Sequence, residues 1–268
     1  MSIDQEATKI TITKEQIQEW NVFFALPCYD SHVTEPFMMS LLPAFLYYKE
    51  IGLKCSVTTI SDSLIARARN SLVAKFMSNP EYTHIIFIDS DIQFDKEAVL
   101  KLLWHNQDVI AGSYPVKEIN WDNVKEAAKN DVEAKDLPSH ATRHVINIGI
   151  ADQKSINIKN GAMEVYEAGT GFMLIKREVF EKMFKKYKKL QYKDDTGSLF
   201  GAELKNAYAL FNSYVDDDGR FLSEDYGFCR YWQKMAGKIY IEPTINLIHF
   251  GRMKYQGNML DYIKRITQ

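Results

Sequence analysis

The feature that most constrains the fold is an apolar run at residues 85–88 that ends in two carboxylates, Asp89 and Asp91. A short run of isoleucine and phenylalanine bounded by polar residues is typical of a strand that is buried on both faces. In open α/β sheets, ligands bind at the carboxyl ends of such strands. Because residues two apart on a strand point the same way, we expect both carboxylates to hold one divalent cation together with diphosphate oxygens. A plain surface turn after the strand would explain the same pattern.

Strands and helices alternate around this run, which predicts a parallel α/β unit with right-handed crossovers. The other strands expected in this half are apolar or β-branched and cover residues 22–26, 55–60 and 109–111. The two helices between them are expected at 36–51 and at about 62–77. Pro27 is expected to end the first strand, and Ser61 or Asp62 to cap the second helix.

After residue 112 the alternation weakens, which predicts a smaller antiparallel region on the acceptor side. Its expected strands cover 145–150 and 162–167, paired around an Asn-Gly turn, then 172–175 and 238–242. Ser223 is expected to cap a helix that runs to about residue 236. Without a repeat or linker, we predict a single domain over 1–268, with a nucleotide-sugar half at about 20–112 and an acceptor half at about 113–268.

Composition excludes several classes of protein. The formal net charge is −2, so the chain lacks the basic excess of a general nucleic-acid binder. Three distant cysteines give no disulfide framework and no zinc spacing, which fits a reducing compartment. No apolar run approaches the roughly 20 residues that span a bilayer, and the first residues do not resemble a signal peptide. We therefore expect a soluble, cytoplasmic protein of unknown oligomeric state.

The helix expected at 62–77 carries a charge where an apolar residue is expected. At 100° per residue, Arg69 falls in the middle of its apolar face, whereas Arg67 and Asn70 fall opposite. A guanidinium that faces the sheet needs an anion, which Asp89, Asp91 or a bound diphosphate would supply. An ordinary buried salt bridge would also satisfy it. Arg67 and Asn70 would then contact a ligand at the helix edge or face solvent.

Six short motifs, taken in order, resemble those of GT-A-fold glycosyltransferases. They are Ala-Leu-Pro-Cys-Tyr at 25–29, Ala-Arg-Asn at 68–70, Asp-Ser-Asp at 89–91, Gly-Thr-Gly-Phe at 169–172, Ser-Glu-Asp at 223–225 and His-Phe-Gly at 249–251. The resemblance covers roughly residues 20–257 without indicating one subfamily. The Arg-Ala-Arg-Asn segment is similar to mannan-type mannosyltransferases, and the Glu-Asp helix to the inverting family-2 type.

The resemblance implies a GT-A-like fold and a metal-dependent sugar transfer from a nucleoside-diphosphate sugar to a hydroxyl of a glycan or other acceptor. A UDP-sugar is favoured as donor, with a GDP-sugar next, and the implied metal is Mn²⁺ or Mg²⁺. Asp89, Asp91 and His249 would be the metal ligands, although a histidine at a strand end is also explained by ordinary hydrogen bonding. The metal would neutralise the departing diphosphate.

Contacts to the donor are expected at strand ends, on the 62–77 helix and on a glycine-flanked tail. The candidates are Pro27, Tyr29, Asp62, Arg67, Arg69, Asn70, Ser90, Lys254 and Tyr255. Together with Arg252, the last two would close over the diphosphate as a lid. Strand termination would explain Pro27 equally well, and helix capping would explain Asp62.

On the acceptor side, Asp225 is the candidate general base, which would take the proton of the attacking hydroxyl in an inverting transfer. Acidic residues are also common at helix starts for stability alone. Glu224 would bind the acceptor or face solvent. Gly169, Thr170 and Gly171 would let the backbone approach a sugar closely, or would form a simple turn.

Two other functions remain open. A sugar nucleotidyltransferase would need a glycine-rich loop after the first strand, and residues 26–32 contain no glycine. A non-catalytic nucleotide-sugar or glycan-binding module on the same fold would keep the binding residues without the reaction. The donor sugar, the acceptor and inversion against retention are left open by the sequence.

Overall fold

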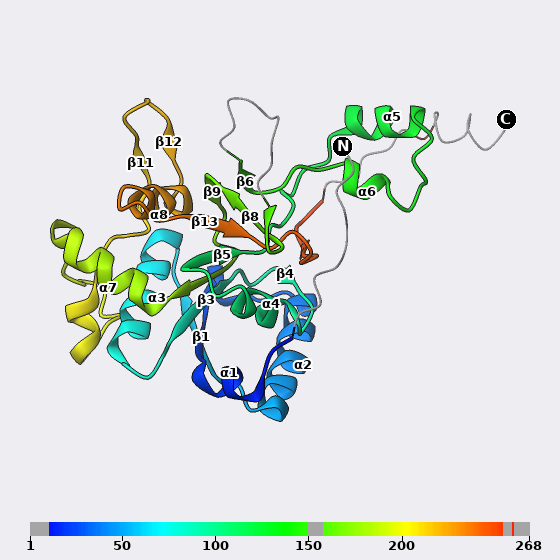
Figure 1. Cartoon of the computed structure of the whole chain (residues 1–268). Coiled ribbons are helices and arrows are strands. Elements are labelled where there is room, and N and C mark those ends of the chain that lie inside the picture. Colours follow the sequence, from blue (N-terminus) through cyan, green and yellow to red (C-terminus); the bar gives the residue numbers. More distant parts are fainter. Residues whose placement is uncertain (1–10, 149–157, 254–258, 260–268) are drawn as a thin grey trace.

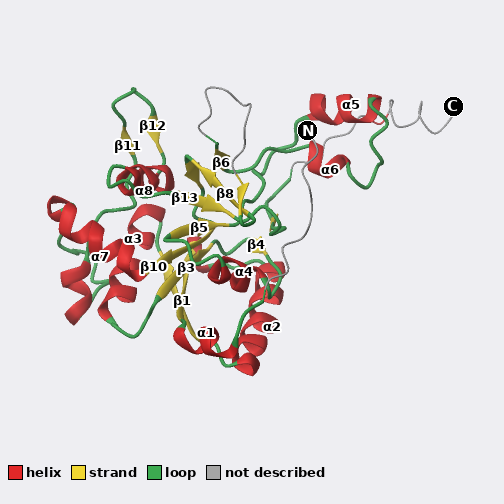
Figure 2. Cartoon of the chain, viewed as in Figure 1, coloured by secondary structure: helices red, strands yellow, loops and turns green. Residues whose placement is uncertain are grey.

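A mixed eight-stranded sheet forms the centre of the protein, in the order β2-β1-β3-β10-β5-β13-β8-β7 (Figure 2). The computed structural model describes residues 11–148, 158–253 and 259. The strands of this sheet are β1 (Asn21–Cys28), β2 (Lys54–Ser61), β3 (His84–Ile88), β5 (Val109–Ala111), β7 (Ile158–Lys159), β8 (Ala162–Val165), β10 (Phe172–Lys176) and β13 (Ile239–Ile241). β10 and β8 run opposite to the other strands. The predicted α/β fold, mainly parallel with a smaller antiparallel part, is confirmed.

Helices cover both faces of the sheet (Figure 1). On one face α2 (Glu35–Ile51) and α4 (Ala98–Trp104) pack on the even-numbered residues of β1 and β3. On the other face α3 (Ile65–Ser78), α7 (Arg177–Lys186) and α8 (Glu224–Gln233) pack on the odd-numbered residues. This alternation is the period of two of a pleated strand, and every residue of β3 is buried as its apolar run predicts.

Short elements complete the chain. They are α1 (Lys14–Glu19), α5 (Trp121–Lys129), α6 (Leu137–His140), the paired strands β4 (Ile92–Gln93) with β14 (Ile248–His249), β6 (Ile146–Asn147) with β9 (Glu167–Ala168), β11 (Tyr214–Val215) with β12 (Phe221–Leu222), and three 3₁₀ turns at Tyr29–Ser31, Lys188–Leu190 and Gly201–Asn206. Figure 1 shows α5 and α6 standing out from the sheet as a separate helical projection. No helix in the described part of the chain is long and apolar enough to cross a lipid bilayer.

β10 joins the two halves of the sequence. It lies between β3 and β5, antiparallel to both, with Phe172 opposite Ile88 and Met173 opposite Ala111. The segment before β10 is therefore placed beside the end of β3. As a result, residues about 80 positions apart in sequence meet at the carboxyl end of the β3 strand.

Three local predictions are wrong. β1 does not end at Pro27 but continues to Cys28, because beyond Ala25 it pairs with β2 alone, and a strand with one neighbour tolerates proline. α3 starts at Ile65, so neither Ser61 nor Asp62 is its cap. The third prediction is wrong only in part: the Asn-Gly hairpin forms but joins β7 to β8, and the predicted pairing of 145–150 with 162–167 is seen where Asn147 lies opposite Glu167.

Candidate functional site

The two carboxylates after β3 lie in a turn and not on a continued strand. The backbone N–H of Ile92 donates to the carbonyl of Asp89 at 3.1 Å, which closes the turn between β3 and β4. The expectation that Asp89 and Asp91 share one strand face is therefore wrong. Each carboxylate contacts a different set of side chains.

Asp89 belongs to a buried cluster around Arg69. Arg69 Nη2 donates to Asp89 Oδ1 at 2.9 Å, and Arg69 Nε to Glu224 Oε1 at 3.3 Å. Only 4% of the Arg69 side chain is exposed. Burial alone would lower the pKa of Arg69, but Asp89 and Glu224 outweigh it and raise that pKa above its usual value. The anion predicted for this arginine is thus Asp89, with Glu224 as a second partner.

Glu224 lies inside the site at the first turn of α8. Its side chain is 14% exposed, which excludes the second of its two expected roles, a solvent-facing residue, and leaves acceptor binding as a prediction. Burial raises the pKa of Glu224, neighbouring Asp225 adds to that effect, and Arg69 opposes it. The proton affinity of this carboxyl is therefore higher than that of a solvated glutamate, which suits proton exchange nearer neutral pH.

Asp91 belongs to a more open cluster. Lys117 Nζ lies 2.5 Å from Asp91 Oδ2, and His249 Nε2 lies 3.3 Å from Asp91 Oδ1. β14 is held against β4 with His249 opposite Ile92, which places the imidazole there. Burial would raise the pKa of Asp91, but the contacts from His249 and Lys117 outweigh it and hold the pKa below its usual range.

The Asp91–His249 pair fits a divalent cation. His249 Nδ1 lies 2.9 Å from the carbonyl oxygen of Pro115, which can only accept, so Nδ1 carries a proton. Nε2 contacts Asp91 Oδ1 at 3.3 Å, and a cation that displaced the proton between them would be bound by both atoms. Asp89 is held by Arg69 instead, and within the described residues no group of three or more histidine, cysteine or acidic side chains is arranged around one point for a metal. The fit is thus to a metal held by two protein ligands, with substrate oxygens completing its shell.

Asp225 is fixed at the start of α8. Its Oδ1 accepts hydrogen bonds from the hydroxyl of Ser223 and, at 2.8 Å, from the backbone N–H of Tyr226. Ser223 occupies the N-cap position without making a side-chain capping bond to the helix. The serine therefore orients the aspartate, and the assignment of Asp225 as general base stays a prediction.

Tyr114 explains why Gly169 and Gly171 are glycines. A Cβ on Gly169 would lie 2.4 Å from the Tyr114 hydroxyl, and one on Gly171 would lie 2.8 Å from Asp89 Oδ2. Gly171 N donates to that hydroxyl at 3.1 Å. The close approach that glycine permits is thus to the protein's own tyrosine and aspartate. Thr170 between them is fully buried.

The remaining donor-side candidates fall into different environments. Asp62 and Arg67 form a two-bond ion pair at 2.6 and 2.7 Å, and Tyr29 is 73% exposed. Pro27 is buried in β1, and the Ser90 carbonyl accepts from the backbone of Thr34 at 2.9 Å.

Asn70 is buried, contrary to the outer-face placement predicted for it. A loop covers that side of α3, and the Asn70 carboxamide exchanges hydrogen bonds of 2.8 and 2.9 Å with the Phe211 backbone. Lys254 and Tyr255, and with them the predicted lid, lie outside the described residues.

Sequence reasoning missed Lys117 and Tyr114. Both follow β5 within six residues, and β5 lies beside β10 in the sheet. The rule that ligand sites gather at the carboxyl ends of strands applies to β5 as it does to β3. The sequence signal for these two residues was the Tyr-Pro-Val-Lys segment at 114–117, which follows soon after the short buried strand β5.

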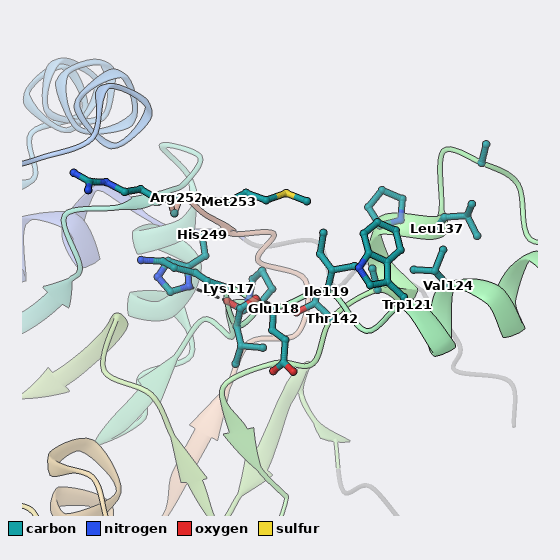
Figure 3. A pocket seen from close by; sticks show the side chains of 16 residues that line it. Lys117, Glu118, Ile119, Trp121, Val124, Leu137, Thr142, His249, Arg252 and Met253 are labelled. Atoms are coloured by element: carbon teal, nitrogen blue, oxygen red, sulfur yellow. Dashed lines mark hydrogen bonds between the residues drawn. The ribbon is translucent and has the colours of Figure 1, made fainter. Parts of the chain in front are cut away.

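A cavity of about 680 Å³ adjoins the Asp91 cluster (Figure 3). Three segments line it: residues 115–124, residues 134–142 and the chain from His249 to Met253. Figure 3 shows His249, Lys117 and Arg252 at one end, and Trp121, Val124 and Leu137 at the other. The cavity therefore has a polar end at the candidate site and an apolar end on the helical projection.

Comparison with known proteins adds little to this geometry. No family model matches the chain, and no curated protein matches it either. Among solved structures, A197 from STIV resembles it with a TM-score of 0.46 at 16% sequence identity, over 87% of this chain and 86% of that one. A likeness of this extent assigns no activity, so a function has to follow from the side chains of the site.

Proposed function

We propose that the protein is a metal-dependent glycosyltransferase that moves a sugar from a nucleoside-diphosphate sugar to a hydroxyl of a glycan or other acceptor. The observation that carries the proposal is the Asp91–His249 pair at the carboxyl end of the sheet, with the carboxylates of α8 on the other side of Arg69. A UDP-sugar is favoured as donor, and a GDP-sugar comes next. The sequence motifs that resemble GT-A-fold enzymes fall on these residues.

Asp91 and His249 would hold Mn²⁺ or Mg²⁺, with the diphosphate supplying further oxygens. The bound metal would stabilise negative charge on the leaving diphosphate. Lys117 lies beside Asp91 and brings an ammonium group to the same place. Arg252, exposed on the chain that follows β14, is a second cation within reach of the cavity's polar end.

The carboxylates of α8 would handle the proton. Asp225 takes the proton of the acceptor hydroxyl while the oxygen of that hydroxyl forms a bond to the anomeric carbon. The bond from that carbon to the phosphate oxygen breaks, and the nucleoside diphosphate leaves with the electron pair. Ser223 and the Tyr226 N–H orient the Asp225 carboxylate, while Glu224, tied to Arg69, contacts the acceptor. This arrangement favours inversion at the anomeric carbon.

Calorimetry with UDP, GDP, CDP and dTDP, each with and without Mn²⁺, tests the donor part. We expect manganese-dependent binding of one nucleotide, with UDP tightest, and its loss in Asp91→Asn. Manganese-independent binding that survives Asp91→Asn would contradict the metal site.

Transfer assays with the matching nucleotide sugar test the proton part. Asp225→Asn should keep donor binding and stop transfer, whereas Asp217→Asn, at a side chain 94% exposed, should change neither. If wild-type protein binds donor and acceptor but transfers no sugar, the non-catalytic binding module replaces the enzyme.

A further inference from the structure

We propose that the cavity between the helical projection and the chain after β14 binds the acceptor, and that this acceptor is an uncharged amphiphile: a hydroxyl-bearing or sugar head on an alkyl or aryl body. This inference rests on the proposed glycosyl transfer, because it takes the Asp91–His249 end of the cavity as the place of reaction. It adds the chemical class of the acceptor.

The cavity has the size and lining of a small-molecule site. Its volume of about 680 Å³ lies within the range of roughly 300–1,000 Å³ that ligand pockets occupy. Most of the side chains around it are apolar, among them Ile119, Trp121, Val124, Leu137 and Met253. Three of these are unusually open for their type: Trp121 is 66%, Met253 47% and Ile119 38% exposed. An apolar body in the cavity would remove that surface from water.

The projection that carries this lining is held together mainly by its own contacts. α5 starts at a proper cap, because Asn120 Oδ1 accepts from the backbone of Asp122 and Asn123 at 3.1 Å each. The Asn120 N–H in turn donates to the Ala141 carbonyl at 2.7 Å, which closes the projection at its base. The helix is therefore positioned locally, and Trp121 at its first turn is left facing the cavity.

The two ends of the cavity set the orientation of the occupant. Lys117 and His249, which line its polar end, are the side chains that contact Asp91. The reacting hydroxyl leaves the cavity at this end, where the diphosphate of the donor would be held, and meets Asp225 beyond it. Tyr114 links the two places, because its ring lies 5.2 Å from that of His249 and burial, Asp89 and Asp225 all raise its pKa. The body of the acceptor then extends towards Trp121 and Leu137, as the arrangement in Figure 3 shows.

Charge complementarity favours a neutral head. Arg69 is already shared by Asp89 and Glu224, and Lys117 is paired with Asp91. The donor diphosphate would take up the positive charge that remains at this end, which is that of Arg252. A second phosphate beside it would meet both the diphosphate and these carboxylates, and like charges at such separations repel. A hydroxyl or sugar head avoids that repulsion.

Binding of n-octyl glucoside below its micelle-forming concentration tests the proposal by calorimetry, with glucose and n-octyl phosphate as companion probes. We expect the glucoside to bind and glucose alone to bind much more weakly. Trp121→Ala should weaken glucoside binding by at least about tenfold, the scale of one large apolar contact. Ile119→Ser, a smaller change in the same lining, should weaken it by a smaller factor.

Leu46→Ala is the matched control, because Leu46 is 71% exposed and lines a separate surface pocket on α2. It should leave glucoside binding unchanged. Equal losses in Leu46→Ala, or none in Trp121→Ala and Ile119→Ser, would overturn the acceptor cavity. Tighter binding of octyl phosphate than of octyl glucoside would overturn the neutral head.

Nucleotide binding separates this inference from the proposed function. Manganese-dependent nucleotide binding should need Asp91 and be unaffected by Trp121→Ala. If it persists while glucoside binding fails, the acceptor assignment alone is wrong. If Trp121→Ala removes nucleotide binding instead, the cavity holds the base of the donor and the inference falls.

Discussion

One residue separates Asp89 from Asp91, and their side chains are similarly exposed at 25% and 29%, yet they contact different partners. Asp89 contacts a guanidinium that is almost fully buried and that a second acid, Glu224, also contacts. Asp91 contacts the ammonium of Lys117, a side chain that is 40% exposed, and the imidazole of His249. The turn after β3 separates them, because it directs the first carboxylate under α3 and the second towards β14.

The difference shows that the two carboxylates of an Asp-x-Asp motif can have separate partners and so separate roles. In the Asp89 cluster, Arg69 bridges Asp89 and Glu224 and so links α3 and α8 to the end of β3. The Asp91 cluster is more open, because the Lys117 side chain that contacts Asp91 is 40% exposed. We therefore predict that ligands bind at the Asp91 cluster and that the Asp89 cluster contributes mainly to stability.

The largest effect is expected from Arg69→Met. Removing the guanidinium leaves Asp89 and Glu224 as uncompensated, largely buried carboxylates, so unfolding should become easier by about 3–5 kcal/mol. Urea denaturation measures it. Arg67→Met is the control on the same helix, because the Arg67 side chain is 38% exposed and its loss should cost clearly less stability than that of Arg69. A cost for Arg69→Met as small as the control's would remove the distinction between the two clusters.

Replacing each aspartate by asparagine in turn should affect stability in one variant and nucleotide binding in the other. Asp89→Asn loses a charged hydrogen bond to Arg69 and should destabilise the protein by about 2 kcal/mol. Asp91→Asn should cost less than about 1 kcal/mol in stability but reduce manganese-dependent nucleotide affinity by at least about tenfold. Urea denaturation measures the stability of both variants, and calorimetry measures their nucleotide affinity. A loss of affinity in Asp89→Asn and not in Asp91→Asn would show that Asp89 is the metal ligand.

Lys117→Met tests whether the lysine competes with a metal ion for Asp91. Without the ammonium, Asp91 is free for a metal, so Mn²⁺ alone should bind a few-fold more tightly, on the scale of a partly exposed ion pair of about 1 kcal/mol. Nucleoside diphosphate, which loses a cation, should bind more weakly. Lys135→Met, in an exposed pair with Glu133, is the control and should alter neither. Unchanged metal affinity in Lys117→Met would mean that the lysine does not compete for Asp91.

The smallest effect is a pair of opposite pH slopes. The folded-state pKa of Asp91 is below its usual 3.8, so its stabilisation is present above 3.8 and is lost as pH falls through the folded value. Burial raises the folded-state pKa of Glu224 above its usual 4.5. The stabilisation from Glu224 is therefore present below pH 4.5 and is lost as pH rises through the raised pKa. The free energy of unfolding is measured by urea denaturation between pH 3 and about pH 7. Asp91→Asn should remove its rise with pH, and Glu224→Gln should remove its fall with pH. Slopes of the same sign would contradict the two environments.

Much of the fold could be predicted from the sequence because β3 and its neighbours are locally consistent. The buried run at 85–88 and the helix after Thr34 carry their periods and caps within a few residues. The sheet-facing charge of Arg69 was also visible, since a helical wheel depends only on spacing. Two predictions failed for different reasons. Asn70 is buried by the Phe211 loop, which is distant in sequence, whereas Asp62 pairs locally with Arg67 instead of capping α3.

The site was harder to predict than the fold for a related reason. The spacing of Asp89 and Asp91 says nothing of the turn between β3 and β4, which is set by pairing with β14, more than 150 residues away. Lys117 is reached only once β5 lies beside β10. The metal role of His249 and the general-base role of Asp225 stay predictions that the experiments above test.

β10 also has a consequence for how the protein is made. A chain emerging from the ribosome completes β1, β2, β3 and β5 long before residues 172–176 are available. Until then β3 and β5 each have an unpaired edge, and such edges invite pairing with other chains. The closing strand is the one whose preceding glycines touch Asp89 and Tyr114. Both edges therefore stay open until β10 has been synthesised, and Asp89 and Tyr114 gain their contacts with the preceding glycines only from that point on.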